Sequence, residues 1–236
     1  MLPILYIDDQ LIAIDKPAGM LVHRSKIDAQ EKVFALQTLR DQIGERVYPV
    51  HRLDKPTSGV LLFARNSEIA SIVASDFAGH KIKKKYMAIV RGWTPETDTI
   101  DYALKPIYDR TTDRHRVNNK PAQEAQTEFL TLSTCELPFR VGRYASVRYS
   151  LVEIRPKTGR KNQIRRHFKH IFHPIVGDRK FGDDAHNRFF KENFHVDRML
   201  LAATGLELRH PTTSKVLKIE CEHGFSDSMM GNLGFG

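Results

Sequence analysis

The chain has 236 residues, of which 41% are hydrophobic and 28% are charged, a composition typical of a soluble globular protein with one core. Its longest apolar run, residues 60–64, is far too short to cross a membrane, and acidic residues interrupt the N-terminal apolar stretch, which excludes a signal peptide. The net charge of +9 is typical of a protein with a polyanionic partner, although charge alone leaves a merely basic enzyme open. Two isolated cysteines, Cys135 and Cys221, favour a reducing cytoplasm.

The first half of the chain is predicted to form short strands and two helices. Apolar residues at helical spacing predict a helix over residues 33–43, and a second helix is expected to begin at Asn66 or Ser67 and to end near Gly79. The branched apolar run at residues 59–64 predicts a buried strand. Other extended segments are predicted over residues 4–6, 11–15, 47–50 and 84–90.

The second half adds strands and one more helix. Residues 105–125 are polar, with a basic cluster at Arg110, Arg114 and Arg116, and predict a loop or a mobile arm. Apolar residues recurring at i, i+4 and i+7 predict a helix over residues 161–172. Strands are predicted over residues 126–132, 147–155, 206–209 and 216–220.

The predicted elements favour an α+β fold. Strands outnumber helices and no regular βαβ alternation appears, so a mixed, mainly antiparallel sheet flanked by helices is expected. No internal repeat or clear linker divides the chain. We therefore expect a single catalytic domain over residues 1–236.

The densest polar segment is HRLDKPTSG, residues 51–59, which lies between two apolar strand candidates. Pro56 and Gly59 force a turn, so the polar side chains are expected in a loop between strands, where functional sites concentrate. A solvated surface turn is the alternative that this segment alone leaves open.

The segment resembles the HRLDxxTSG signature of the RluA-type family of pseudouridine synthases, in which the aspartate is catalytic. All seven specified positions match, and Asp54 stands at the aspartate. Further segments resemble the family's patterns KPxGxxVH, KxYxA, TGRxHQIR and HPIxGDxxYG, and they follow in the same order at residues 16–23, 85–88, 158–165 and 173–182. The resemblance covers nearly the whole chain and implies the family's fold and its activity, the isomerisation of uridine to pseudouridine in RNA.

Two positions lack a histidine that the family's patterns have. Asn162 stands where TGRxHQIR has histidine, and Ala202 stands where a late LHA motif has histidine. Neither position is the catalytic aspartate, its ionic partner or the active-site tyrosine. We therefore expect the departures to affect packing and RNA contact more than the chemistry.

The resemblance implies roles for four residues. Asp54 is the catalytic carboxylate, Arg165 is its cationic partner, and Tyr86 stacks on the target base. A guanidinium suits this position because it stays charged and can bind both carboxylate oxygens. Outside the family's motifs, Arg165 would be one more solvated charge and Tyr86 a core tyrosine. Arg52 is expected on the same side of a strand as Asp54, where it fills the space left by a flipped uridine.

Basic residues around these positions are expected to contact the RNA, because phosphates dominate the affinity of such complexes. The expected RNA-binding residues are Lys16, His51, Arg52, Arg160, Lys161, Arg166 and Lys169. A solvated helix face is the alternative for the residues between positions 160 and 169.

The reaction breaks the N1–C1′ bond, turns the uracil and rejoins it through C5. It is redox-neutral, so no cofactor is expected, and the sequence has neither a GxGxxG nor a P-loop motif. A carboxylate can begin the reaction by attacking C1′, by adding to C6 or by removing a proton from C2′. The sequence leaves these three routes open.

Rival hypotheses are weaker. His167, His170 and His173 recur every third residue, but Pro174 ends the helix and no acidic or cysteine partner accompanies them, so no metal is expected. Ser58 lacks the GxSxG context of a hydrolase. A non-catalytic RNA-binding or RNA-folding protein and a base-removing glycosidase remain alternatives.

The expected substrate is tRNA. Segments at residues 22–25, 142–144, 148–153 and 187–188 resemble the subgroup of the family that modifies uridine 65 of tRNA. Ribosomal RNA is the alternative target. We expect a cytoplasmic monomer without membrane association. The catalytic motifs begin close to the N-terminus, so no accessory N-terminal RNA-binding domain is expected.

Overall fold

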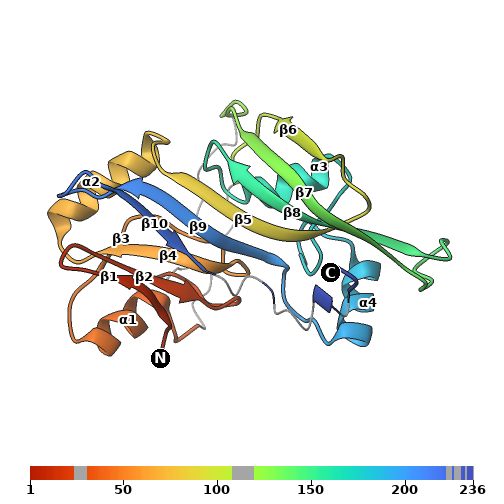
Figure 1. Ribbon diagram of the computed structural model, residues 1–236, viewed down its shortest axis with the longest axis horizontal. Coiled ribbons are helices and arrows are strands. Elements are labelled where there is room, and N and C mark those ends of the chain that lie inside the picture. The colour runs from red at the N-terminus through yellow and green to blue at the C-terminus, as the bar shows by residue number, and fades with distance from the viewer. Residues whose placement is uncertain (24–30, 108–119, 222–224, 226–229, 232, 236) are drawn as a thin grey trace.

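The computed structural model describes residues 1–23, 31–107, 120–221, 225, 230–231 and 233–235. Within that part of the chain, ten strands form one sheet in the order β1-β2-β4-β9-β5-β8-β7-β6, with β3 beside β4 and β10 beside β9 (Figure 1). The strands are β1 (Ile4–Ile7), β2 (Leu11–Lys16), β3 (Tyr48–Pro49), β4 (Ser58–Ala64), β5 (Lys83–Arg91), β6 (Thr97–Asp101), β7 (Gln126–Leu137), β8 (Val147–Pro156), β9 (Leu201–Arg209) and β10 (Val216–Glu220). Only β4 and β9 pair in parallel, which confirms the mixed, mainly antiparallel sheet.

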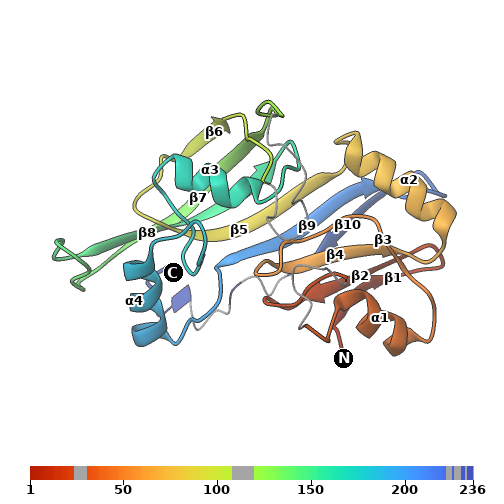
Figure 2. The ribbon, with the colours of Figure 1, turned by 180° about the vertical axis from the view of Figure 1, so that it is seen from behind.

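Helices cover both faces of this sheet. They are α1 (Ala35–Ile43), α2 (Ser67–Ala78), α3 (Gln163–His170) and α4 (Asp184–Phe194). Side chains alternate between faces along a strand. In β4, Phe63 packs in the cluster of α1 and Leu62 in that of α2; in β5, Ala88 packs with α3 and Ile89 with α4. Helices α1 and α3 therefore lie on one face, turned toward the viewer in Figure 2, and the clusters of α2 and α4 lie on the other.

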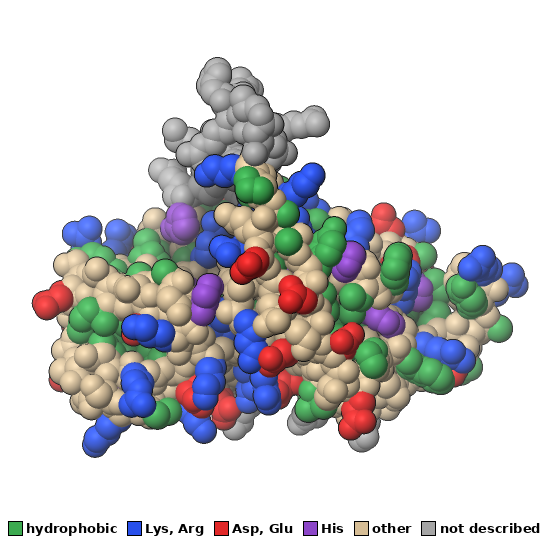
Figure 3. Space-filling view, turned by 90° about the horizontal axis from the view of Figure 1, so that it is seen from above, with side chains coloured by type: hydrophobic (Ala, Val, Ile, Leu, Met, Phe, Trp, Pro, Cys, Tyr) green, Lys and Arg blue, Asp and Glu red, His purple; other side chains and the backbone are tan. Residues whose placement is uncertain are grey.

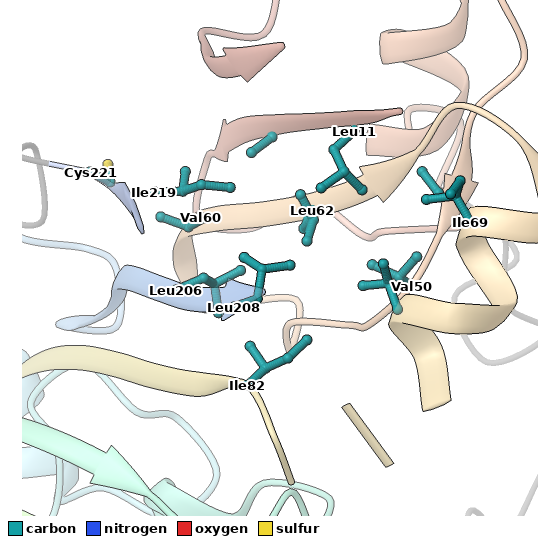
Figure 4. Packing of buried hydrophobic residues seen from close by; sticks show 13 residues of the cluster. Leu11, Val50, Val60, Leu62, Ile69, Ile82, Leu206, Leu208, Ile219 and Cys221 are labelled. Carbon is teal, nitrogen blue, oxygen red and sulfur yellow. The ribbon is translucent and has the colours of Figure 1, made fainter. Parts of the chain in front are cut away.

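One buried cluster anchors the start of the motif loop at residues 51–59. Figure 4 shows Val50, which directly precedes this loop, beside Ile69 of α2 and near Leu62 of β4. Burying an aliphatic side chain of this size contributes about 1.5–3 kcal/mol. The loop therefore begins at a residue fixed in the core and ends in the buried strand β4.

Most predicted elements are confirmed, and their ends have local causes. Asn66 caps α2 by accepting a hydrogen bond from the Ile69 amide at 2.9 Å, and Gly79 follows its last residue. The third helix is shorter than predicted, because Asn162 adopts a left-handed conformation with φ 55° just before α3 begins. The helix then ends at His170.

The sequence analysis did not predict β6, α4 or the first half of β9. Strand β6 (TDTID) is polar and mostly exposed at the end of the sheet, so it carries almost no apolar alternation. The buried residues of α4 are the adjacent Phe189 and Phe190, which give only a weak helical period. The predicted basic cluster at Arg110, Arg114 and Arg116 lies outside the described residues.

Two further features concern the cysteines and the length of the helices. Both cysteines are buried in different clusters and neither forms a disulfide. In the part of the chain that the structure describes, no helix is long and apolar enough to span a membrane.

Gly59 should be intolerant of a side chain. Its φ is +103°, and a Cβ would lie 2.1 Å from the carbonyl oxygen of Ala203, its partner in the parallel β4–β9 pair. We expect Gly59→Ala to lower the free energy of unfolding by about 3 kcal/mol or more, measured by urea denaturation. Gly19→Ala is the control, because Gly19 has φ +86° but nothing within 4 Å of its Cβ position. A similar loss in both variants would contradict the role of the β4–β9 contact.

Candidate active site

Asp54 lies in the loop between β3 and β4. The amide of Thr57 donates to the Asp54 carbonyl at 3.0 Å, which closes a turn, and Leu53 and Thr57 are buried. The Asp54 side chain is 22% exposed and lines a cleft of about 480 Å³. Burial of its neighbours thus holds the backbone while the carboxylate points into accessible space.

A buried lysine holds this loop in place by hydrogen bonds to backbone carbonyls. Lys16, the last residue of β2, is 0% exposed, and its Nζ donates to the carbonyls of Pro17, Met20 and Lys55 at 2.8, 2.9 and 3.3 Å. The ammonium therefore joins the loop after β2 to the loop that carries Asp54. Burial lowers the pKa of Lys16 to about 8, although Asp54 and Asp15 oppose the shift. Lys16 is predicted to bind RNA, but the structure places its amine in the interior, hydrogen-bonded to three backbone carbonyls and away from solvent.

Arg165 is the electrostatic centre of the site. Its Nε and Nη2 donate to the two carboxylate oxygens of Asp178 at 2.7 and 2.8 Å, and its Nη1 donates to Asn162 Oδ1 at 2.9 Å. The same Nη1 lies 3.5 Å from Asp54 Oδ2. The structure therefore brings Asp54 and Arg165 together as the family resemblance implied, but the tight bidentate partner of Arg165 is Asp178.

The surroundings keep both members of the tight pair ionised. Burial opposes the charge of Arg165, yet hydrogen bonding and attraction from Asp178 and Asp54 raise its pKa. Burial likewise opposes the charge of Asp178, yet Arg165 and the amides of Phe181 and Lys180 hold its pKa below the usual value. Asp178 carries no signal in the sequence beyond its place in the HPIxGDxxYG pattern, and the sequence analysis did not select it.

The departure at Asn162 has a visible consequence. Asparagine tolerates the left-handed conformation seen here better than most residues. In that conformation its side chain accepts from Arg165 and helps to hold the guanidinium. Ala202, the other departure, is buried in β9 between Ser58 and Met87 of the neighbouring strands, so it affects packing.

Tyr86 lines the same cleft from β5. Burial, with a smaller contribution from Asp54, raises the pKa of its phenol above the ordinary range, so the hydroxyl stays protonated. Lys84, two residues earlier and so on the same side of the strand, also lines the cleft and donates to the Thr158 carbonyl at 2.9 Å. Burial lowers its pKa to about 8. The sequence analysis missed Lys84, although its spacing from Tyr86 would have placed it here.

His51 lines the cleft as a neutral ring. It stacks on Phe77 with ring centroids 4.4 Å apart, and its Nε2 accepts from the Leu62 amide at 2.9 Å. Burial, and then the charge of Lys84, lower its pKa to about 3. Any contact of His51 with RNA is therefore made by an uncharged side chain.

The other predicted RNA-binding residues lie at the cleft and along α3. Arg52, Arg160 and Lys161 line the cleft. Arg52 lies in a loop, so the strand alternation expected to align it with Asp54 does not apply. Arg166 and Lys169 extend the basic surface along α3, with Arg166 half-buried and Lys169 exposed. Figure 3, a view from above, shows several Lys and Arg side chains near the middle of the molecule, with others scattered toward both ends and acidic side chains among them.

The three spaced histidines serve structural purposes. His167 is buried and contacts Thr127 Oγ1 and the Tyr102 carbonyl, both at 3.0 Å. His170 stacks on Tyr102, and His173 contacts the Arg91 carbonyl at 2.8 Å. Among the described residues, no group of His, Cys, Asp and Glu is arranged to hold a metal ion.

Comparisons with known proteins agree on one family. A family model described as RNA pseudouridylate synthase matches residues 10–170. The chain is 49% identical to tRNA pseudouridine synthase C of Vibrio cholerae over 98% of its own length and 100% of the relative, and 54% identical to the Haemophilus ducreyi protein of that name over 92% and 89%. The structure of human RNA Pseudouridylate Synthase Domain Containing 1 superposes with a TM-score of 0.74 at 24% identity, covering 97% of this chain and 86% of that one, so the two share a fold.

Lys16 should be a stability residue. We expect Lys16→Met to lower the free energy of unfolding by about 1–3 kcal/mol, because it leaves buried carbonyls without a donor, as urea denaturation would show. Lys169→Met, which changes an exposed lysine, should leave the unfolding midpoint unchanged. Equal midpoints for the two variants would rule out the clamp.

The same lysine should give stability a pH dependence. Its pKa is lowered from 10.5 to about 8 in the folded chain, so the unfolded chain binds more protons between those values. The contribution of Lys16 to stability therefore rises with pH through this window. Urea denaturation at pH 8 and pH 10 should show a smaller increase, or a larger decrease, for Lys16→Met than for wild type, and an identical pH response would contradict the lowered pKa.

Proposed function

Because the chain belongs to the RNA pseudouridylate synthase family, we propose that it isomerises a specific uridine of tRNA to pseudouridine, with Asp54 as the catalytic carboxylate. The observation that supports this role is the cleft itself. Asp54, Arg165 and Tyr86 come from a loop, a helix and a strand far apart in the sequence, and all three line it.

The geometry suits a carboxylate that must act as an anion. Arg165 is a fixed positive charge 3.5 Å from Asp54, and it is kept in place by Asp178 and Asn162. The looser contact leaves Asp54 able to turn toward a substrate atom. Attack at C1′, addition at C6 and proton removal at C2′ all use this charged form, and the proposal holds for each.

Tyr86 supplies a flat ring with a protonated hydroxyl on the wall of the same cleft. We propose that the target uracil stacks on it after the nucleotide leaves its helix, and that Arg52 occupies the vacated space. Flipping a nucleotide costs a few kcal/mol, so contacts that replace stacking lower this cost. The reaction is redox-neutral and loses no atoms, so the proposal requires no cofactor.

The proposed target is uridine 65 of tRNA. Relatives that are about half identical to this chain over nearly its whole length carry the name tRNA pseudouridine synthase C. We also propose that the protein acts as a monomer in the cytoplasm. Mapping of pseudouridine in total tRNA and rRNA, with and without the gene, tests the target: an unchanged tRNA site beside a lost rRNA site would overturn it.

Asp54→Asn should abolish catalysis without unfolding the protein. We expect pseudouridine formation to fall by about three orders of magnitude or more, because the amide cannot act as the anion, while RNA binding remains. Nucleoside analysis by chromatography and mass spectrometry measures the product.

Glu153→Gln is a matched control for this variant, since Glu153 is a partly buried carboxylate paired with Arg155 on β8, outside the cleft. It should keep full activity. Two results would sink the assignment. A loss of RNA mass would show base removal instead of isomerisation, and wild-type protein that binds RNA without making pseudouridine would favour a non-catalytic role.

A further inference from the structure

A second group of basic and aromatic side chains lies on the same sheet face as the cleft. In β8, Arg148, Ser150, Val152, Ile154 and Pro156 alternate onto one face, where Val152 and Ile154 pack against α3 and Pro156 lines the cleft. Arg148 lies at the other end of this row. At a rise of ~3.3 Å per residue, the strand places Arg148 about 25 Å from Pro156.

Arg148 is paired with an exposed tryptophan. Its guanidinium carbon lies 4.0 Å from the centroid of the Trp93 ring, and Trp93 is 47% exposed. The Gly92 amide donates to the Arg148 carbonyl at 2.7 Å, the Thr94 amide to Ser150 Oγ at 3.0 Å, and the indole Nε1 to the Cys135 carbonyl at 3.1 Å. The ring is therefore held rigidly although nearly half of it is open to solvent.

The neighbouring hairpin tip has the same chemistry. Residues 138–148 (PFRVGRYASVR) contain three arginines and no acidic residue. Arg143 stacks over Tyr144, which is 59% exposed, and donates to its hydroxyl at 2.7 Å. Figure 2 shows this end of the β7–β8 hairpin projecting beyond the body of the molecule.

Exposed aromatic rings beside arginines are the features that bind single-stranded nucleic acid, since bases stack on the rings and phosphates meet the cations. A purely structural cation–π pair would also satisfy Arg148, which pairs with Glu136 as well. That explanation does not account for a second arginine–aromatic pair at Arg143 and Tyr144, nor for the excess of positive charge along the tip.

We propose that Trp93, Arg148 and the hairpin tip form a second contact surface for the substrate RNA, which receives an unpaired base on Trp93 and the adjoining phosphates on the arginines. This inference rests on the proposed function. It explains how the protein selects a long RNA, because a substrate that reaches both the cleft and Trp93 must span about 25 Å.

Trp93 is the only tryptophan of the chain, so its fluorescence reports on this surface directly. In a titration of the intact protein with full-length tRNA, we expect saturable quenching at the concentrations that saturate pseudouridine formation. Unchanged fluorescence while pseudouridine forms would overturn the proposal. Absence of pseudouridine in every RNA tested would instead count against the proposed function, and the fluorescence response to RNA would still be readable.

Variants give an independent test. Trp93→Ala should raise KM for full-length tRNA about tenfold with kcat within about twofold, and Trp93→Phe should restore most of the affinity because it keeps a ring. Arg148→Ala should also reduce the dependence of log affinity on log salt by about one unit.

Arg155→Ala is the matched control, because Arg155 is an exposed, ion-paired arginine on the opposite face of the same strand. It should change neither KM for full-length tRNA nor the dependence of log affinity on log salt. For a short stem that carries the target uridine but cannot span about 25 Å, KM should be the same with wild type and with Trp93→Ala. An equal rise of KM for the short stem and the full tRNA would refute a separate contact surface.

Discussion

The site depends on one buried guanidinium and on how its charge is compensated. Removing a partner from a buried ion pair costs about 3–5 kcal/mol, so Arg165 requires acceptors wherever it is placed. Asp178 meets that requirement with two short hydrogen bonds, and Asn162 adds a third. Asp54, at 3.5 Å, is thus not needed to hold Arg165 in place. In the proposed reaction, a carboxylate that acts on the substrate gains from a cation whose position does not depend on that carboxylate.

Asp178, which compensates the charge of Arg165, is itself held by a tightly packed loop. Asp178 is 1% exposed and lies between two glycines at which a Cβ would collide with backbone: Gly177 with Arg198 and Gly182 with Asp178 itself. Asn187 of α4 accepts from the Gly177 amide at 2.7 Å and donates to the Asp178 carbonyl at 3.1 Å. Helix α4 lies on the sheet face opposite α3, so the position of Arg165 is tied to the packing of both faces.

Sequence reasoning identified the proposed catalytic groups better than the residues that hold them in place. Asp54, Tyr86 and Arg165 follow from motif resemblance, and the strands around them follow from apolar alternation. The burial of Lys16, by contrast, depends on three carbonyls brought together by two separate loops, and no local pattern encodes such a contact. The preference of Arg165 for Asp178 depends on a separation of 13 residues and on the left-handed turn at Asn162. A charge count cannot distinguish a clamped ammonium from an RNA-binding one.

The register of the sheet fixes how far apart the cleft and the hairpin lie, which local motifs do not reveal. Tyr86 and Arg91 pair with Ile154 and Tyr149, so β5 and β8 run together from the cleft toward the hairpin. The alternation of side chains along these strands decides which of them lie on the same side of the sheet as the cleft. Tyr149 turns to the α4 cluster, and Arg148, one residue earlier, turns to the face of the cleft. A one-residue slip in this register would exchange the two and bury an arginine. The pairing that brings Tyr86 to the cleft therefore also fixes the position of Arg148, on which the proposed second RNA contact surface depends.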